Sequence, residues 1–154
     1  MNRELRTALG HWATGVVVVT ATAADGSDFG LTVNSFASVS LDPPLVLWSL
    51  QNDKPYGAVF SDGYCVNVLG SDQSELVWKF TRGTQAERFE GVSVVRLPSG
   101  RARIAGAIAY FDCQLYNQVT AGDHTILIGE VLEYAAETRP PAVFNQGALV
   151  QVAS

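Results

Sequence analysis

Hydrophobic and polar positions follow one another in short blocks along the chain, and most blocks have the period of a β-strand. Apolar, β-branched runs bounded by Gly, Pro, Asn or Asp predict strands, and these runs cover residues 15–22, 30–42, 45–50, 64–69, 92–95, 103–120 and 125–134. Asp25-Gly26 predicts a tight turn between the first two strands, and residues 121–124 predict a hairpin turn late in the chain. Consecutive hairpins without β-α-β alternation predict a mainly β fold, an antiparallel barrel with short flanking helices.

Three segments have features of helices. Leu5, Ala8, Leu9 and Trp12 have the spacing i, i+3, i+4 and i+7, which predicts a short amphipathic helix whose apolar stripe belongs to the core. Residue types favoured at helix N-termini open two further segments, 53–61 and 72–83. Residues 88–91 are expected to be a connector, and Arg139-Pro140-Pro141 is expected to end the sheet.

The second predicted strand carries an unusual row of polar side chains. Thr32, Asn34, Ser38 and Ser40 share one parity, so an extended chain places them on one face. A solvated face of an antiparallel sheet is one explanation. The other is a ligand, because the four side chains are all short and Phe36 has the same parity. Short donors and acceptors around an aromatic ring suit a flat heteroaromatic molecule.

Composition narrows the class of protein. The 154 residues predict one domain, 1–154, and a content of 47% hydrophobic and 16% charged residues favours a large buried fraction or a homo-oligomer. A net charge of −5 argues against nucleic-acid binding. We expect no membrane span and no signal peptide, because the longest apolar run is short. Cys65 and Cys113 form no C-x-x-C motif and are expected to be buried thiols in a reducing cytoplasm.

Familiar catalytic motifs are absent from the sequence, which has no G-x-G-x-x-G, P-loop, G-x-S-x-G or H-E-x-x-H. The two histidines, His11 and His124, are too few for a histidine-based metal site, so no metal is predicted. His11 stands among core-type residues. His124 follows Gly122-Asp123 at a predicted hairpin tip, where it is either an exposed turn residue or a functional contact.

Several blocks together resemble the short-chain flavin reductases, the reductase components of two-component flavin-dependent monooxygenases. The resemblance extends from about Trp12 to Gly147, and its blocks occur in the family's order. The blocks are residues 31–45 (LTVNSFASVSLDPPL), Val66-Asn67-Val68-Leu69 followed by Gln73, Arg88-Phe89, Gly122-Asp123-His124 and Ile128-Gly129-Glu130-Val131. The resemblance implies an FMN-binding split β-barrel, a homodimer, and reduction of FMN or FAD by NADH or NADPH. It also implies release of reduced flavin to a separate oxygenase.

The same resemblance implies site residues. Those expected at the flavin ring and ribityl chain are Thr32, Val33, Asn34, Ser35 and Ser38, and those expected at the phosphate end are Ser49, Leu50, Gln51 and Lys54. Asn67 is expected beside the flavin, and His124 is expected to face the nicotinamide as the catalytic residue. The chain departs from the family at Leu149, where a tyrosine is common, and at Lys54, where small hydroxyl residues are common.

Two other functions remain open at this point. A flavin-binding split barrel without turnover, such as a carrier or sensor, has the same cofactor site. A partner-binding barrel explains the polar parity as solvated surface. The sequence does not distinguish FMN from FAD or NADH from NADPH, and it does not identify the oxygenase partner.

Overall fold

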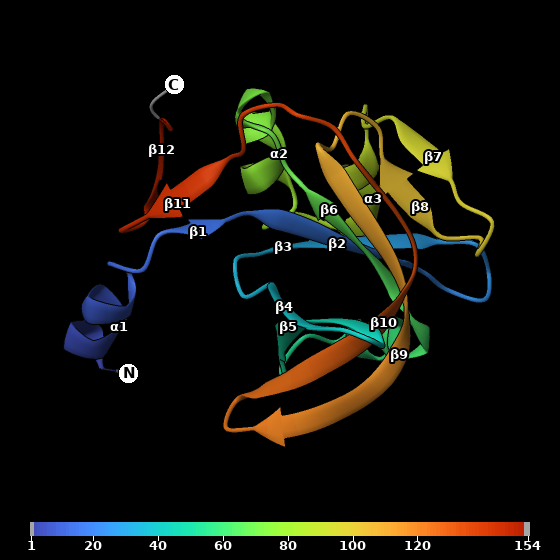
Figure 1. Cartoon of the computed structure of the whole chain (residues 1–154), viewed down its shortest axis with the longest axis horizontal. Coiled ribbons are helices and arrows are strands. Elements are labelled where there is room, and N and C mark those ends of the chain that lie inside the picture. The colour runs from blue at the N-terminus through green and yellow to red at the C-terminus, as the bar shows by residue number, and fades with distance from the viewer. Residues whose placement is uncertain (1, 153–154) are drawn as a thin grey trace.

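Strands dominate the computed structural model, which describes residues 2–152 (Figure 1). The largest sheet is antiparallel and has the strand order β3-β2-β6-β9-β10-β5-β4. Its strands are β2 (Val17–Thr22), β3 (Asp28–Val33), β4 (Ala37–Leu41), β5 (Pro44–Gln51), β6 (Tyr64–Val68), β9 (Ala109–Ala121) and β10 (His124–Ala136). The predicted mainly β, antiparallel architecture is confirmed.

The order of the strands requires this sheet to curl. β3 and β4 form its two opposite edges, yet only residues 34–36 link them. A flat seven-stranded sheet separates its edges by about 29 Å at a strand spacing of about 4.8 Å. The link from Val33 to Ala37 spans at most about 14 Å. The two edges therefore approach one another, as in an incompletely closed, split barrel.

Two small sheets and several short helices surround the large sheet. One small sheet contains β1 (Thr14–Gly15), β11 (Val143–Asn145) and β12 (Ala148–Val150), and the other pairs β7 (Val94–Arg96) with β8 (Ala102–Ile104). The helices are α1 (Arg3–Leu9), α2 (Ser74–Lys79) and α3 (Gln85–Phe89), with 3₁₀ turns η1 (Gly57–Asp62) and η2 (Ser71–Gln73). No helix among residues 2–152 is long and apolar enough to cross a membrane.

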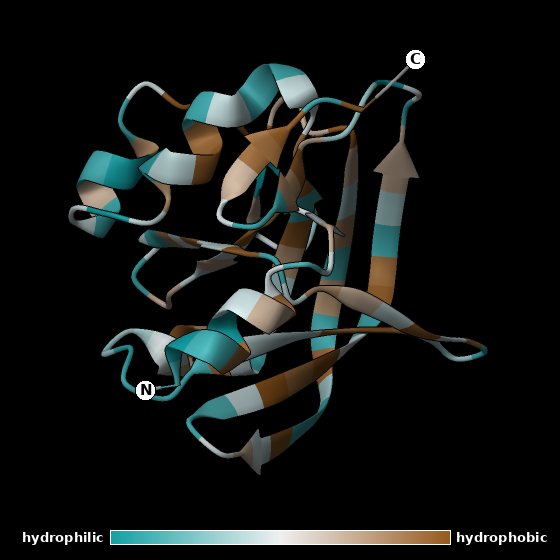
Figure 2. Cartoon of the chain, turned by 90° about the vertical axis from the view of Figure 1, so that its left-hand side faces the viewer, coloured by the Kyte–Doolittle hydropathy of each residue, from teal (hydrophilic) through white to brown (hydrophobic). Residues whose placement is uncertain are grey.

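Strand β2 lies between two hydrophobic clusters. Val17 and Val19 face the cluster inside the curled sheet, and Val16 and Val18 face a second cluster that includes Val77 of α2. This position explains the unbroken apolar run of β2, because both of its faces are buried. Figure 2 shows that hydrophobic positions, in brown, occur along the strands and are interspersed with white and teal positions. The predicted hairpin of β2 and β3 is confirmed by their antiparallel pairing.

The structure corrects several of the expected elements. The apolar stripe of α1 does not lie in the core, because Leu5, Leu9 and Trp12 are all exposed. The expected connector at 88–91 begins inside α3, whose capping box joins Thr84 and Glu87. The expected strand 103–120 is interrupted between β8 and β9, where Gly106 has a positive φ of 84°.

Candidate functional site

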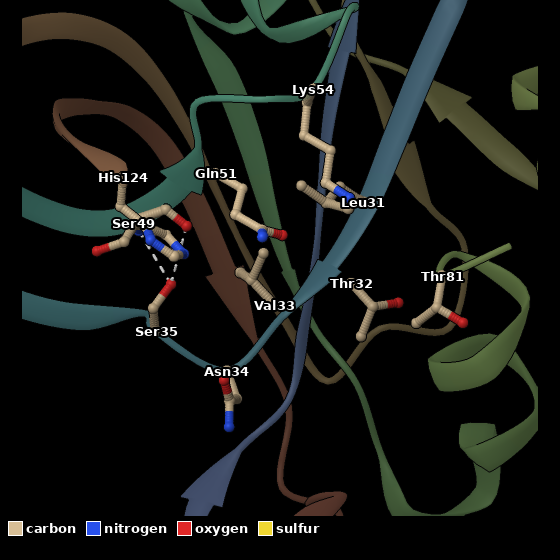
Figure 3. A pocket seen from close by; sticks show the side chains of 10 residues that line it. All are labelled: Leu31, Thr32, Val33, Asn34, Ser35, Ser49, Gln51, Lys54, Thr81 and His124. Atoms are coloured by element: carbon tan, nitrogen blue, oxygen red, sulfur yellow. Dashed lines mark hydrogen bonds between the residues drawn. The ribbon is translucent and has the colours of Figure 1, made fainter. Parts of the chain in front are cut away.

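A cavity of about 340 Å³ opens between edge strand β3, the link that follows it, and the end of strand β5. It lies between the end of β3, the end of β5 with its following loop, and the turn that begins β10 (Figure 3). The residues that line it are Leu31, Thr32, Val33, Asn34, Ser35, Ser49, Gln51, Lys54, Thr81 and His124. Its volume is in the range of small-ligand sites, about 300–1,000 Å³.

Hydroxyl groups build the walls of this cavity. The Ser49 backbone N–H donates to Ser35 Oγ at 2.9 Å, which joins the link after β3 to strand β5. Thr32 Oγ1 donates to the Val77 carbonyl at 2.7 Å, which holds α2 against β3. These two hydroxyls are therefore engaged within the protein. Of the row of polar side chains that share one parity in the sequence, Thr32 thus has a structural role, because its hydroxyl connects two neighbouring elements.

Nitrogen-bearing side chains supply most of the remaining polar lining. Asn34 and Gln51 come from opposite sides of the cavity, and Lys54 extends over it from the loop after β5 (Figure 3). Lys54 forms no ion pair with a carboxylate in residues 2–152. An unpaired ammonium group beside amide donors, in a chain of net charge −5, is suited to bind an anion such as a phosphate.

The turn that carries His124 is fixed to the same loop by Asn52. The Asn52 N–H donates to the Asp123 carbonyl at 2.9 Å, and Thr125 Oγ1 donates to Asn52 Oδ1 at 2.7 Å. These bonds hold His124 and Lys54 at one cavity. Asn52 lies within the segment Ser49 to Lys54 that the family resemblance places at the phosphate end. Its bonds to the turn before β10 were not predicted, because they join residues that are far apart in the sequence.

Asp123 orients the His124 ring. Their Oδ1 and Nδ1 atoms are 2.7 Å apart, and the hydrogen bond with His124 lowers the pKa of the Asp123 carboxyl. An ionised carboxylate only accepts hydrogen bonds, so Nδ1 carries the proton in this pair. Nε2 then remains for a ligand. The pair lies at the cavity edge, where His124 is partly exposed.

An apolar trough adjoins the cavity on the side of α2. Its volume is about 170 Å³, and it shares Thr32, Val33, Asn34 and Thr81 with the cavity. The rest of its lining is Val16, Val77, Trp78 and Phe144. A polar cavity with a cation, continuous with an apolar trough, suits a ligand that is flat and apolar at one end and anionic at the other.

The structure places three predicted site residues outside this cavity. Ser38 is exposed on edge strand β4, because the chain turns after Asn34 and the strand predicted over 30–42 is two strands. Leu50 is buried in the main core cluster, on the opposite side of β5 from its lining neighbours. Leu31 and Thr81 line the cavity although the sequence analysis did not select them.

Asn67 is the third predicted site residue that lies outside the cavity, and it has a structural role. Its side chain is fully buried, and Nδ2 donates to the Val18 carbonyl at 2.9 Å and to Thr20 Oγ1 at 3.1 Å. Oδ1 accepts from the Ile104 N–H at 2.8 Å. Asn67 therefore joins β2, β6 and β8, and the expectation that it lies beside the flavin is not supported.

Comparison with protein-family models identifies the chain. The model of the flavin reductase like domain matches residues 9–153. The chain belongs to this family. Within residues 2–152, no group of three or more His, Cys, Asp or Glu side chains is placed to hold a metal ion.

Relatives of this family are similar along most of the chain. The FMN reductase (NADH) SmoA of Agrobacterium fabrum is 44% identical over 149 residues, which are 96% of this chain and 84% of the relative. The reductase component of the flavin-dependent trigonelline monooxygenase of Acinetobacter baylyi is 40% identical over 136 residues, 87% of this chain but only 44% of the relative. The chain thus spans less than half of that second protein.

Solved structures of flavin reductases share the fold. The NADH:FAD oxidoreductase SgcE6 of Streptomyces globisporus, solved in complex with NAD and FAD fragments, has a TM-score of 0.90 and 33% identity, covering 97% of this chain and 92% of that one. The flavin reductase PheA2 in its native state has a TM-score of 0.87 and 35% identity, with complete coverage of both chains, 100% and 100%. The split-barrel expectation agrees with these neighbours.

Proposed function

We propose that this chain is an NAD(P)H:flavin oxidoreductase that reduces FMN or FAD and supplies the reduced flavin to a separate monooxygenase. The observation that carries the proposal is the cavity itself, which combines a free lysine, amide donors and His124 with an adjoining apolar trough. Family membership and the relatives described as reductase components support it. When bound, the flavin accepts a hydride from the reduced nicotinamide.

In this proposal the cavity binds the two chemically different ends of the flavin, which are the anionic phosphate and the flat ring system. Lys54 and Gln51 hold the phosphate, because an ammonium and an amide N–H both donate to phosphate oxygens. The apolar trough receives part of the ring system, and Asn34 donates to a heteroatom at its edge. Donors aimed at the ring also stabilise the negative charge that develops there on reduction. The cavity is open to solvent, which suits a flavin that must leave.

His124 orients the nicotinamide in this proposal. The Asp123 carboxylate accepts a hydrogen bond from the Nδ1–H group of His124. Nε2 therefore carries no proton, and it accepts a hydrogen bond from the nicotinamide carboxamide. Hydride transfer needs two rings stacked at close distance, so positioning is the main task of the protein. A paired-carboxylate or triad arrangement is not required for this chemistry.

Steady-state kinetics test the proposed activity. Purified protein should oxidise NADH or NADPH only when FMN or FAD is added, and His124→Ala should raise the KM for the nicotinamide nucleotide or lower kcat. His11→Ala is the matched control, because His11 contacts Thr7 and Gln146 and does not line the cavity. A flavin carrier would bind FMN without turnover. No flavin-dependent rate with either nucleotide would refute the proposal.

A homodimer and a cytoplasmic location belong to the same proposal. Large apolar side chains are exposed on β4, β9 and β10, namely Val39, Leu41, Tyr116, Val119, Leu132 and Tyr134. A second copy carries the same surfaces and can cover them around a twofold axis. Light scattering should give twice the mass of one chain, and a monomeric mass would contradict it. The two cysteines are free, as expected in a reducing cytoplasm.

A further inference from the structure

The side chain of Asn52 does not line the cavity, and it brackets the dipeptide Asp123-His124. Its Nδ2 group donates to the Gly122 carbonyl at 3.4 Å, and its Oδ1 atom accepts from Thr125 Oγ1 at 2.7 Å. The Asn52 backbone N–H also donates to the Asp123 carbonyl at 2.9 Å. Asn52 is thus bonded to the residue before the dipeptide, to the dipeptide itself and to the residue after it.

The contact between Asp123 and His124 depends on such support, because both side chains are accessible to water. The Asp123 side chain is 89% exposed and that of His124 is 41% exposed, although Oδ1 and Nδ1 are only 2.7 Å apart. An exposed pair of this kind gains little net free energy, since the ordering of two side chains offsets the attraction. The backbone of the turn therefore decides whether the carboxylate stays at Nδ1.

The turn itself lies at the unpacked end of a long hairpin. Residues 116–121 of β9 are all exposed in the single chain. On the other side of the turn, the pairing of β10 with β5 ends at His124 and Gln51. Gly122 and Asp123 lie beyond this last pair. Asn52 directly follows Gln51, so its bonds extend the connection from β5 to the turn.

We propose that Asn52 is a positioning residue, which keeps His124 in the tautomer that binds the nicotinamide carboxamide. The inference rests on the proposed function, in which an unprotonated Nε2 atom accepts from that carboxamide. With the bracket intact, the Asp123 carboxylate accepts from Nδ1–H and Nε2 carries no proton. Without the bracket, the carboxylate leaves Nδ1 and the proton is shared between both ring nitrogens. A ring protonated at Nε2 meets the carboxamide N–H with a donor instead of an acceptor.

Thr125→Val tests this role with little change of shape, because a methyl group replaces the hydroxyl that donates to Asn52. We expect kcat/KM for NADH to fall about fivefold, the effect of one lost hydrogen bond, while the KM for FMN stays within about twofold. Thr125→Ser keeps the hydroxyl and should behave as the wild type. Asn52→Ala, which removes both side-chain bonds, should lower kcat/KM for NADH at least as much as Thr125→Val.

A double-mutant cycle distinguishes positioning from a general loss of structure. A residue that acts only through His124 has no further effect once the imidazole is removed, so its loss is not additive with that of His124. Introduced into His124→Ala, both Thr125→Val and Asn52→Ala should therefore leave kcat/KM for NADH within about twofold. A full additional loss in that background would show that Asn52 acts independently of His124, and it would overturn the inference.

Nitrogen-15 NMR of the imidazole rings provides a readout that does not depend on activity. The chain has two histidines, so His11 serves as an internal control. The wild type should show the Nδ1–H tautomer at His124, and Thr125→Val and Asn52→Ala should shift His124 toward a mixture of tautomers without changing His11. An unchanged His124 tautomer in both variants would overturn the inference. If the wild type shows no flavin-dependent NADH oxidation, the proposed function fails instead, and the NMR spectra still decide whether Asn52 orients His124.

Discussion

Replacing Asn67 by alanine tests the division between structural and ligand-binding residues. The amide of Asn67 has no contact with the cavity and joins β2, β6 and β8 inside the protein. Asn67→Ala removes its bonds to the Val18 carbonyl and to Thr20, and it leaves the buried Ile104 N–H without its acceptor. The variant should therefore lose stability and retain its affinity for flavin.

The size of the effect follows from the groups left unsatisfied. A buried polar group without a partner costs about 1–3 kcal/mol. The substitution leaves the Ile104 N–H without its acceptor and also removes the two bonds that Asn67 Nδ2 donates, although the Thr20 hydroxyl still donates to the Ala102 carbonyl. We expect a loss of about 3 kcal/mol, a large share of the roughly 5–15 kcal/mol that stabilises an ordinary domain. With a urea m value of about 2 kcal/mol/M, the unfolding midpoint should fall by about 1.5 M.

Urea unfolding followed by circular dichroism measures this change, and KM for FMN at low temperature measures the site. Asn117→Ala is the matched control, because Asn117 is exposed on β9 and should change stability by less than about 0.5 kcal/mol. An unchanged midpoint together with a marked loss of FMN affinity would refute the reasoning, since Asn67 would then act at the ligand and not in the core.

Three further predictions concern charge, reactivity and packing. Lys54→Met should raise the KM for FMN about tenfold and leave that for riboflavin unchanged, because riboflavin has no phosphate; equal losses on both flavins would contradict this. Burial raises the pKa of the Cys113 thiol to about 12 and also raises the pKa of Cys65. At pH 8 about one Cys113 side chain in 10⁴ is a thiolate. The thiols of the native protein should therefore not react with a disulfide reagent until urea unfolds the protein. Fast reaction of the thiols in the native protein would argue against their burial. Gly30→Ala places a Cβ 2.6 Å from the Phe80 ring, so it should cost about 1–3 kcal/mol of stability, and a neutral result would show that α2 moves freely.

Local patterns predicted the elements whose partners are close in sequence. The Asp25-Gly26 turn fixed the pairing of β2 with β3, and the turn before β10 placed His124 at a hairpin tip. The double-sided burial of β2 also followed from its unbroken apolar run. In each case the pattern and the structure lie within one hairpin or one strand.

Long-range contacts account for the errors. The helical spacing of Leu5, Leu9 and Trp12 predicts an apolar stripe correctly, but periodicity cannot say whether the same chain covers it. Asn67 interrupts an apolar strand in the sequence, and only the packing of β8 against β6 shows that its amide bonds to Ile104. Helix α3 was missed although Thr84 and Glu87 form a capping box, a signal that the sequence did contain.

The candidate site could be predicted in part for the same reason. The link after β3 and the end of β5 with its loop were both selected, and the structure joins the link to β5 through Ser35 and Ser49. Thr81 carries no motif of its own and reaches the cavity only because α2 packs across Gly30. Its contribution depends on the curl of the sheet, which no short sequence pattern encodes.

A crystal structure of the protein with FMN tests the central claim most directly. The account predicts that the phosphate lies within hydrogen-bond distance of Lys54 Nζ and that the ring lies along residues 32–35, with His124 at the edge of the same cavity. Electron density for FMN at any other surface, with Lys54 and Asn34 contacting only solvent, would contradict it.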